Sequence, residues 1–192
     1  MKNQEKAQKY TLYIKRFNKA VANEFYLEAM WILYAMIEDR TSAFLYHIGF
    51  TSEKNRNKIT SKSFIKKEIR GILQLQGKGK IYLKSLSNKF CYIKQVFDWA
   101  KNVVALGDFQ KDLKGKILKI ITEEFSDNVN YLNNVWRNKR NVLTHSLFTT
   151  ANMKEGELAC LVEQGYMAIR IFDKMISQLK KGVNIREKFR IL

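Results

Sequence analysis

The chain has 192 residues, of which 46% are hydrophobic, with nine glycines and no proline. This apolar content is enough for one packed core and excludes a disordered chain, while the length is short for two domains. Because proline collects in loops and at strand edges but is excluded from helix interiors, its absence predicts an all-α fold. The net charge of +17 predicts a polyanionic partner. A lysine-favouring codon usage is the alternative source of this charge.

Cysteine usage and hydropathy indicate where the protein works. Cys91 and Cys160 lie far apart without metal-ligand spacing, which argues for a reducing compartment and against a disulfide scaffold or a zinc site. Residues 1–10 are polar and lack the apolar stretch of a signal peptide. The longest apolar run, residues 29–37, is far shorter than the roughly 20 residues that cross a bilayer. We therefore expect a cytoplasmic protein with no membrane segment, no metal and no other cofactor.

In the first half of the chain, hydrophobic residues recur at helical spacing. A first helix is predicted over about residues 4–20. A second begins near Asn23, a good N-cap, and ends at about Ile48; it is the most hydrophobic and should be central. Residues 51–62 are polar and predict a loop, and Ser63 precedes a short basic helix. The loop at residues 76–80 lacks the lysine-serine or lysine-threonine pair of a phosphate-binding P-loop.

The second half continues the helical pattern. A helix begins near Asn88 and ends around Gly107, and Asp108 can cap the next one. Ser126 or Asp127 indicates a break before a helix over about residues 128–148, and a turn follows at residues 149–152. The last long helix, about residues 154–181, is clearly amphipathic. The elements predict an up-and-down bundle of four main helices with additional short helices, in a single domain over residues 1–192.

Positive charge is concentrated between Lys54 and Lys94, where twelve Lys and Arg residues accompany one acidic residue, Glu68. Four aromatic residues are interleaved with them: Phe64, Tyr82, Phe90 and Tyr92. A basic segment with aromatic residues can hold phosphates and stack unpaired bases. We expect the lysines as a group to contact a polyanion, whereas Phe64 and Phe90 fall on apolar stripes and are expected in the core.

The predicted helix over residues 128–148 has an unusual outer face. At about 100° per residue, its apolar side chains cluster on one side: Val129, Leu132, Trp136, Leu143 and Leu147. The opposite side forms a polar stripe: Asn130, Asn134, Arg137, Asn141 and His145. Solvated helix faces ordinarily use Lys and Glu, which favour helix more than Asn does. The stripe therefore predicts a contact that uses these hydrogen-bonding groups, with Asn134, Arg137 and Lys139 as candidate RNA-binding residues.

Arg140 and His145 have the chemistry for RNA cleavage without a metal. A histidine can take a proton from a ribose 2′-hydroxyl or give one to the leaving oxygen. An arginine can clamp the phosphate and stabilise the charge of the transition state. The two residues lie about 140° apart on one helix, so a second copy packed across a twofold axis would bring both into one cleft. The alternative for His145 is a surface or capping histidine near a helix C-terminus.

These residues resemble a known signature. The segment Arg140-Asn141-Val142-Leu143-Thr144-His145 looks like the R-x4–6-H motif of the HEPN superfamily, in which a polar residue, often Asn, follows the arginine. The resemblance implies a metal-independent endoribonuclease that cleaves single-stranded RNA and dimerises to build its site, typical of bacterial toxin and abortive-infection proteins active against phage. It assigns catalysis to Arg140 and His145 and the polar position to Asn141. A cognate antitoxin and a phage-derived trigger are both open as further partners.

A second charged cluster, Glu38-Asp39-Arg40, directly follows the longest apolar run. Some HEPN proteins resemble this in having an acidic or polar residue on an earlier helix that orients the catalytic arginine. Glu38 and Arg40 are therefore candidate supporting residues. A surface ion pair between Glu38 and a lysine is the alternative. His47, at the end of the same predicted helix, is expected to be structural.

Two other functions fit the same sequence. One is a non-catalytic basic helical module that binds nucleic acid or a partner protein through residues 54–94. The other is a purely protein-binding role, such as an accessory subunit, in which the charge reflects composition alone. Cleavage of RNA, and its dependence on His145, would separate the ribonuclease from both.

Overall fold

The computed structural model describes residues 3–52, 54–74, 81–146 and 155–191, without the side chains of residues 3–7, 9, 144–146 and 155. Within these ranges the chain is helical and contains no β-strand; Thr51 and Ile59 form one isolated antiparallel bridge. The predicted all-α fold is confirmed. In the same ranges, no helix combines the length and the apolar character needed to cross a membrane.

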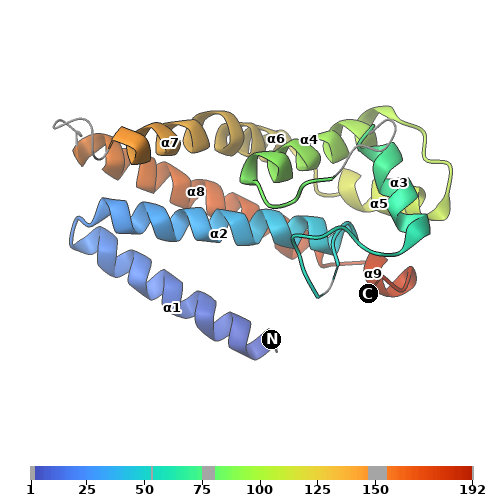
Figure 1. The fold of residues 1–192 in the computed structure, drawn as a ribbon, viewed down its shortest axis with the longest axis horizontal. Helices are drawn as coiled ribbons and strands as arrows, with labels where there is room; N and C mark the ends of the chain where they lie inside the picture. Colours follow the sequence, from blue (N-terminus) through green and yellow to red (C-terminus); the bar gives the residue numbers. More distant parts are fainter. Residues whose placement is uncertain (1–2, 53, 75–80, 147–154, 192) are drawn as a thin grey trace.

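Long helices run along the length of the molecule (Figure 1). They are α1 (Asn3–Ala22), α2 (Tyr26–His47), α8 (Glu155–Leu179) and a composite helix of α6 (Glu123–Asn130), the π-helical η1 (Tyr131–Trp136) and α7 (Arg137–Ser146). The most extensive helix–helix contact joins α2 and α8, and α1 packs on α2. The shorter elements gather toward one end: α3 (Ser63–Ile72), α5 (Asp108–Leu118) and α9 (Ile185–Lys188), with α4 (Leu86–Asn102) leading toward them.

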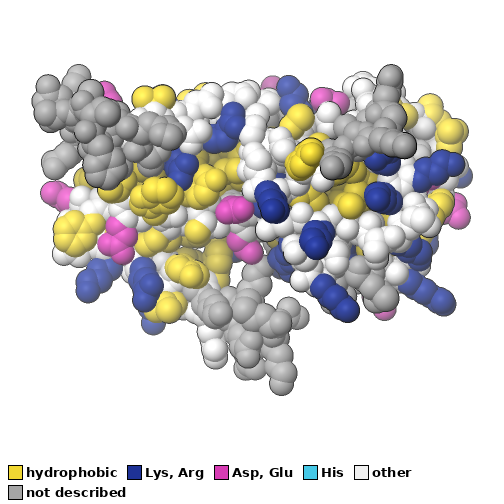
Figure 2. Space-filling view, in the orientation of Figure 1, with side chains coloured by type: hydrophobic (Ala, Val, Ile, Leu, Met, Phe, Trp, Pro, Cys, Tyr) yellow, Lys and Arg dark blue, Asp and Glu magenta, His cyan; other side chains and the backbone are white. Residues whose placement is uncertain are grey.

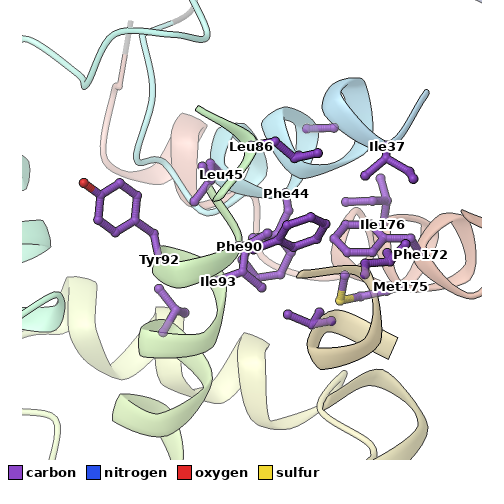
Figure 3. Close-up of a cluster of buried hydrophobic side chains, with 14 of the residues drawn as sticks. Ile37, Phe44, Leu45, Leu86, Phe90, Tyr92, Ile93, Phe172, Met175 and Ile176 are labelled. Carbon is purple, nitrogen blue, oxygen red and sulfur yellow. The ribbon is translucent and has the colours of Figure 1, made fainter. Parts of the chain in front are cut away.

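The core lies where α2, α4 and α8 meet (Figure 3). Each helix presents a hydrophobic stripe to it, and the central side chains are fully or almost fully buried: Ile37, Phe44, Leu45, Phe90, Ile93, Phe172, Met175 and Ile176. The Phe44 ring meets the Phe97 ring edge to face, with centroids 5.8 Å apart, the geometry that aromatic pairs prefer. The predicted central position of the second helix is confirmed.

Several predicted helix boundaries are wrong: α4 ends at Asn102 rather than near Gly107, and Gly107 rather than Asp108 is the N-cap of α5. Two others differ for reasons of local hydrogen bonding. Asn23 does not cap α2: its side-chain amide donates to the Lys19 carbonyl at 2.7 Å, and it therefore lies at the end of α1. Nor does the chain break at Ser126 or Asp127, which lie inside α6. The N-cap is Thr122, whose hydroxyl accepts from the Phe125 N–H at 3.2 Å. A threonine in this position satisfies one of the unpaired N–H groups of the first turn.

Candidate functional site

The helix that bears the motif is fixed to α8 by two buried side chains. The Asn128 amide donates to the Ala168 carbonyl at 3.0 Å, and the Trp136 indole N–H donates to the Leu161 carbonyl at 2.9 Å. Eight positions separate the two donors but only seven separate the two acceptors. The π-helical turn η1 lies between the donors, and because a π turn closes over five residues rather than four, it absorbs the extra residue. The orientation of α7 follows from these anchors.

Close packing around Trp136 requires a glycine on α8. Gly165 is buried directly against the indole ring, and a Cβ atom there would collide with the ring nitrogen and lie 3.2 Å from Leu33 Cδ1. The composite helix and α2 therefore approach the same point of α8 from two sides. The absence of a side chain at Gly165 allows the indole to reach its acceptor.

Arg140 lies one turn after Trp136 and turns toward α2. Its guanidinium carbon is 4.6 Å from the centre of the Trp31 ring and 4.0 Å from the centre of the Tyr34 ring. These two rings meet at 75°, so they form an aromatic corner around the half-buried guanidinium. Arg140 Nη1 also donates to Asn141 Oδ1 at 2.9 Å. Cation–π contacts of this kind attract a guanidinium to the faces of aromatic rings.

The predicted apolar face of this helix is confirmed where it is described. Val129, Leu132 and Trp136 are buried, and Leu143 is half-buried, while Leu147 lies outside the described residues. The polar residues on the opposite side are not uniformly exposed. Its members differ in exposure, since Asn130 and Asn134 are exposed and Arg137 and Asn141 are half-buried.

The predicted RNA-binding residues lie on the outer side of the same helix. The Arg137 guanidinium donates from Nε to the Asn133 carbonyl at 3.0 Å and from Nη2 to Asn138 Oδ1 at 3.3 Å, so it lies flat along the helix. Lys139 and Asn134 are exposed. The His145 side chain lies outside the described residues; the structure gives only its backbone position on α7, five residues after Arg140.

Glu38 forms its ion pair with Lys89 of α4, not with Arg140. Lys89 Nζ lies 3.3 Å from Glu38 Oε1 and donates to Ser42 Oγ at 2.8 Å. The lysine side chain is fully buried, whereas the glutamate is partly exposed. A buried ammonium group loses its hydration, so removal of its carboxylate partner is costly. Glu38 therefore joins α2 to α4 through an ion pair with a lysine, but this lysine is buried, whereas the alternative expected from the sequence was a surface ion pair.

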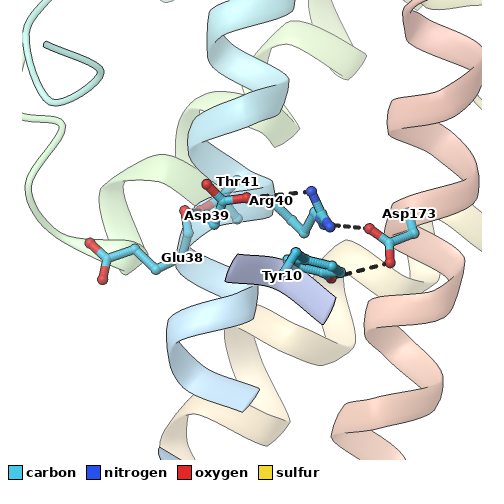
Figure 4. Close-up of polar contacts among 6 residues, drawn as sticks. All are labelled: Tyr10, Glu38, Asp39, Arg40, Thr41 and Asp173. Atoms are coloured by element: carbon cyan, nitrogen blue, oxygen red, sulfur yellow. Dashed lines mark hydrogen bonds and ion pairs between the residues drawn. The ribbon is translucent and has the colours of Figure 1, made fainter. Parts of the chain in front are cut away.

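Arg40 belongs to another cluster, in which α1, α2 and α8 meet (Figure 4). Its guanidinium pairs with Asp173 and with Asp39, and lies 4.0 Å from the centre of the Tyr10 ring. The Tyr10 hydroxyl donates to Asp173 Oδ2 at 3.3 Å. Figure 4 shows Glu38 pointing away from this cluster. The structure thus shows Glu38 and Arg40 bonded to other residues. It gives no support to their predicted role in orienting Arg140.

Burial dominates the acid–base properties of this cluster. It raises the pKa of the Tyr10 phenol to about 12, against the opposing effect of Arg40. Burial also raises the pKa of the Asp173 carboxyl, although Arg40 and the Tyr10 hydroxyl act to lower it. The Tyr10 phenol therefore stays protonated in the folded protein at a pH where an unfolded tyrosine is ionised.

This difference predicts a loss of stability in alkali. An unfolded tyrosine releases its proton near pH 10 and folded Tyr10 near pH 12, so the folded state binds more protons between these values and its stability falls as the pH rises. Between about pH 9 and pH 11, the free energy of unfolding should fall by about 1 kcal/mol more in the unmodified protein than in Tyr10→Phe, after allowance for solvent screening. Urea denaturation measures this difference. Tyr13→Phe, an exposed position on the same helix, should behave as the unmodified protein does; equal losses in all three proteins would contradict the prediction.

Sequence inspection missed the two residues that hold Arg140. Trp31 and Tyr34 are three residues apart on α2 and share one face, and Trp31 is 49% exposed although it is among the largest apolar side chains. The only signal in the sequence was two aromatic residues three positions apart within the longest apolar run, and it does not show which way they face. The candidate site is thus Arg140 in the corner of Trp31 and Tyr34, with Asn141 bonded to it and with Arg137 and Lys139 on the outer side of the same helix. No protein-family model, no curated protein and no solved structure matches the chain.

Proposed function

We propose that the protein is a metal-independent endoribonuclease of the HEPN type, in which Arg140 and His145 cleave single-stranded RNA and Asn141 assists. One observation contributes most: the half-buried Arg140 guanidinium held in the aromatic corner, on the helix that also bears His145. A guanidinium donates hydrogen bonds only in its own plane. The contacts with Trp31 and Tyr34 hold the guanidinium in this corner, and a guanidinium fixed in place loses less freedom when it binds a phosphate.

The proposed reaction needs one base, one acid and a positive charge. His145 would remove the proton of the ribose 2′-hydroxyl, and the oxygen would attack the adjacent phosphorus. Arg140 would stabilise the negative charge that builds up on the phosphoryl oxygens. The bond to the 5′-oxygen would then break, and that oxygen would receive a proton from a second acid. The products would be a 2′,3′-cyclic phosphate and a free 5′-hydroxyl.

A homodimer would supply the second acid as the partner copy of His145. Val135 and Val142 support this arrangement, because both are exposed hydrophobic residues seven positions apart on the motif-bearing helix. Two residues at this spacing lie on one helix face, where the same face of a second copy can cover them. We place such an enzyme in the cytoplasm as a toxin or abortive-infection effector, with a cognate antitoxin or a phage-derived trigger controlling it.

The direct test is incubation of the purified protein with an unstructured RNA in excess EDTA. We expect cleavage at a rate unaffected by the chelator, with 2′,3′-cyclic phosphate and 5′-hydroxyl ends identified by mass spectrometry. Products ending in a 3′-hydroxyl, or activity that disappears with EDTA, would contradict the mechanism. RNA binding without cleavage would favour the non-catalytic basic module instead.

A further inference from the structure

A second surface, formed by α3 and by the chain around the start of α4, combines exposed lysines with exposed aromatic rings. It consists of Phe64, Lys66 and Lys67 on α3, Tyr82 and Lys84 on the segment that leads into α4, and Lys94 on α4 itself, and is called the basic–aromatic surface below. Figure 2 shows Lys and Arg side chains gathered over the half of the molecule that contains α3, α4 and α5. This surface includes none of the residues of the candidate site.

Phe64 lies on the wrong side of α3 for a core residue. The helix buries Ile65, Ile69 and Ile72, which recur at helical spacing on one face. Phe64 lies on the outer side and is 49% exposed, so its predicted place in the core is wrong. Lys67, one turn later on the same outer side, is also exposed. An exposed phenylalanine ring next to exposed lysines can stack on a planar group of a ligand.

Tyr82 is presented by a fixed piece of backbone. Its N–H donates to the Tyr92 hydroxyl at 3.2 Å, and Tyr92 is buried on α4. The Tyr82 ring is 58% exposed, beside the exposed Lys84. A held backbone with an outward-facing ring needs little ordering when a planar group stacks on it.

The charge of this surface is strongly one-sided. The single acidic residue between Lys54 and Lys94, Glu68, is turned toward α5, where its Oε2 accepts from Gln110 Nε2 at 2.6 Å. It is half-buried and does not lie among the exposed lysines. Lys66, Lys67, Lys84 and Lys94 therefore present positive charge to a ligand, with the exposed Asp98 one turn after Lys94 on α4.

We infer that the basic–aromatic surface binds single-stranded RNA, with the lysines contacting phosphates and with Phe64 and Tyr82 stacking on unpaired bases. Lysines alone would hold any polyanion, but duplexes do not offer their base faces, so the two exposed rings select a single strand. The inference deepens the proposed function and depends on it only in taking RNA as the ligand. The start of α4 lies beside the middle of α2, where Lys89 contacts Glu38 and Ser42, and α3 lies farther from α7, so a long strand contacts more of the basic–aromatic surface than a dinucleotide at Arg140 does.

The test measures binding separately from cleavage. All proteins would have His145→Ala, which keeps the RNA intact, and anisotropy would report the binding of an unstructured RNA oligonucleotide and of the matching duplex over a salt series. One variant combines Phe64→Ala and Tyr82→Ala. Another replaces Lys66, Lys67, Lys84 and Lys94 by Gln. The matched control replaces four exposed lysines elsewhere, Lys15, Lys19, Lys119 and Lys180, by Gln and so has the same net charge.

We expect the aromatic variant to bind the single strand roughly 5- to 150-fold more weakly for each stacked base that is lost, with duplex binding unchanged. Replacement of Lys66, Lys67, Lys84 and Lys94 by Gln should reduce the slope of log affinity against log salt concentration by about 0.7 for each phosphate contact removed. Replacement of the four control lysines should leave this slope unchanged. Unchanged single-strand binding by the aromatic variant, or equal effects of the two lysine groups, would overturn the inference.

Failure of the proposed function would look different. If the protein does not cleave RNA but shows this pattern of binding, the inference about the basic–aromatic surface stands and the proposed nuclease function is rejected. In an active enzyme, the same variants without His145→Ala should lower kcat/KM for a long single strand and leave dinucleotide cleavage unchanged. Equal losses on both substrates would overturn the inference while the nuclease stands.

Discussion

Replacement of Arg140 by lysine is expected to lower the rate of RNA cleavage by about 10²- to 10³-fold, the effect of losing one oriented donor to the transition state. Lysine keeps the positive charge, but it has no planar group to lie against Trp31 and Tyr34 and no fork of donors to reach both Asn141 and a phosphate. His145→Ala should abolish cleavage, because the reaction loses its base. Single-turnover kinetics with a labelled RNA in EDTA measure both effects.

The matched controls come from the same chain. Arg170→Lys changes an exposed arginine on α8, and His47→Gln changes the other histidine, at the end of α2. Both should cleave RNA at the unmodified rate, which also excludes a contaminating nuclease as the source of the activity. Circular dichroism and thermal unfolding establish that each variant is folded. Full activity in Arg140→Lys or in His145→Ala would reject the assigned pair.

A single methyl group at Gly165 is expected to destabilise the protein although it lies inside a helix. Alanine in place of a helical glycine ordinarily stabilises by up to about 1 kcal/mol. Here the Cβ atom would meet the Trp136 ring nitrogen. Overpacking costs about 1–3 kcal/mol, and a displaced indole N–H loses a buried hydrogen bond of about 1 kcal/mol or more. The free energy of unfolding in urea should therefore fall by about 1–3 kcal/mol net.

Gly156, on the same helix, provides the control. A Cβ atom there meets nothing within 4 Å, so Gly156→Ala should leave stability unchanged or raise it. A double-mutant cycle adds a sharper criterion. With Trp136→Phe the ring is smaller and donates no hydrogen bond, so Gly165→Ala should cost less in that background. If Gly165→Ala stabilises the protein as Gly156→Ala does, the close contact between α8 and the indole is refuted.

Much of the fold could be predicted because burial follows a short period along the chain. The hydrophobic spacing identified the central α2, the amphipathic α8 and the inner face that contains Leu132 and Trp136. Caps were predicted less well, because a side chain such as Asn23 can bond backward or forward along the chain, and its type alone does not decide which.

The site was harder to predict than the helices. Arg140 and Asn141 were identified as candidates from their spacing to His145, but their neighbours were not. To predict that Arg140 contacts Trp31 and Tyr34, one must know how α7 is rotated about its own axis. The two hydrogen bonds to α8 and the π turn η1 set this rotation together. A uniform 100° step per residue contains no information about such a turn. The ion pairs of Glu38 and Arg40 likewise depend on which helices become neighbours.

The wide turn of η1 also bears on how the chain can change in length. The composite helix has one residue more than its contact with α8 requires, and the surplus is confined between Asn128 and Trp136. A homologue with one residue fewer in that interval would form an ordinary α-helix, keep both anchors and present its arginine to the same aromatic corner. A deletion of one residue between Asn128 and Trp136 is therefore compatible with an unchanged site. A deletion at this place would distinguish true relatives from chains that share only the six-residue motif.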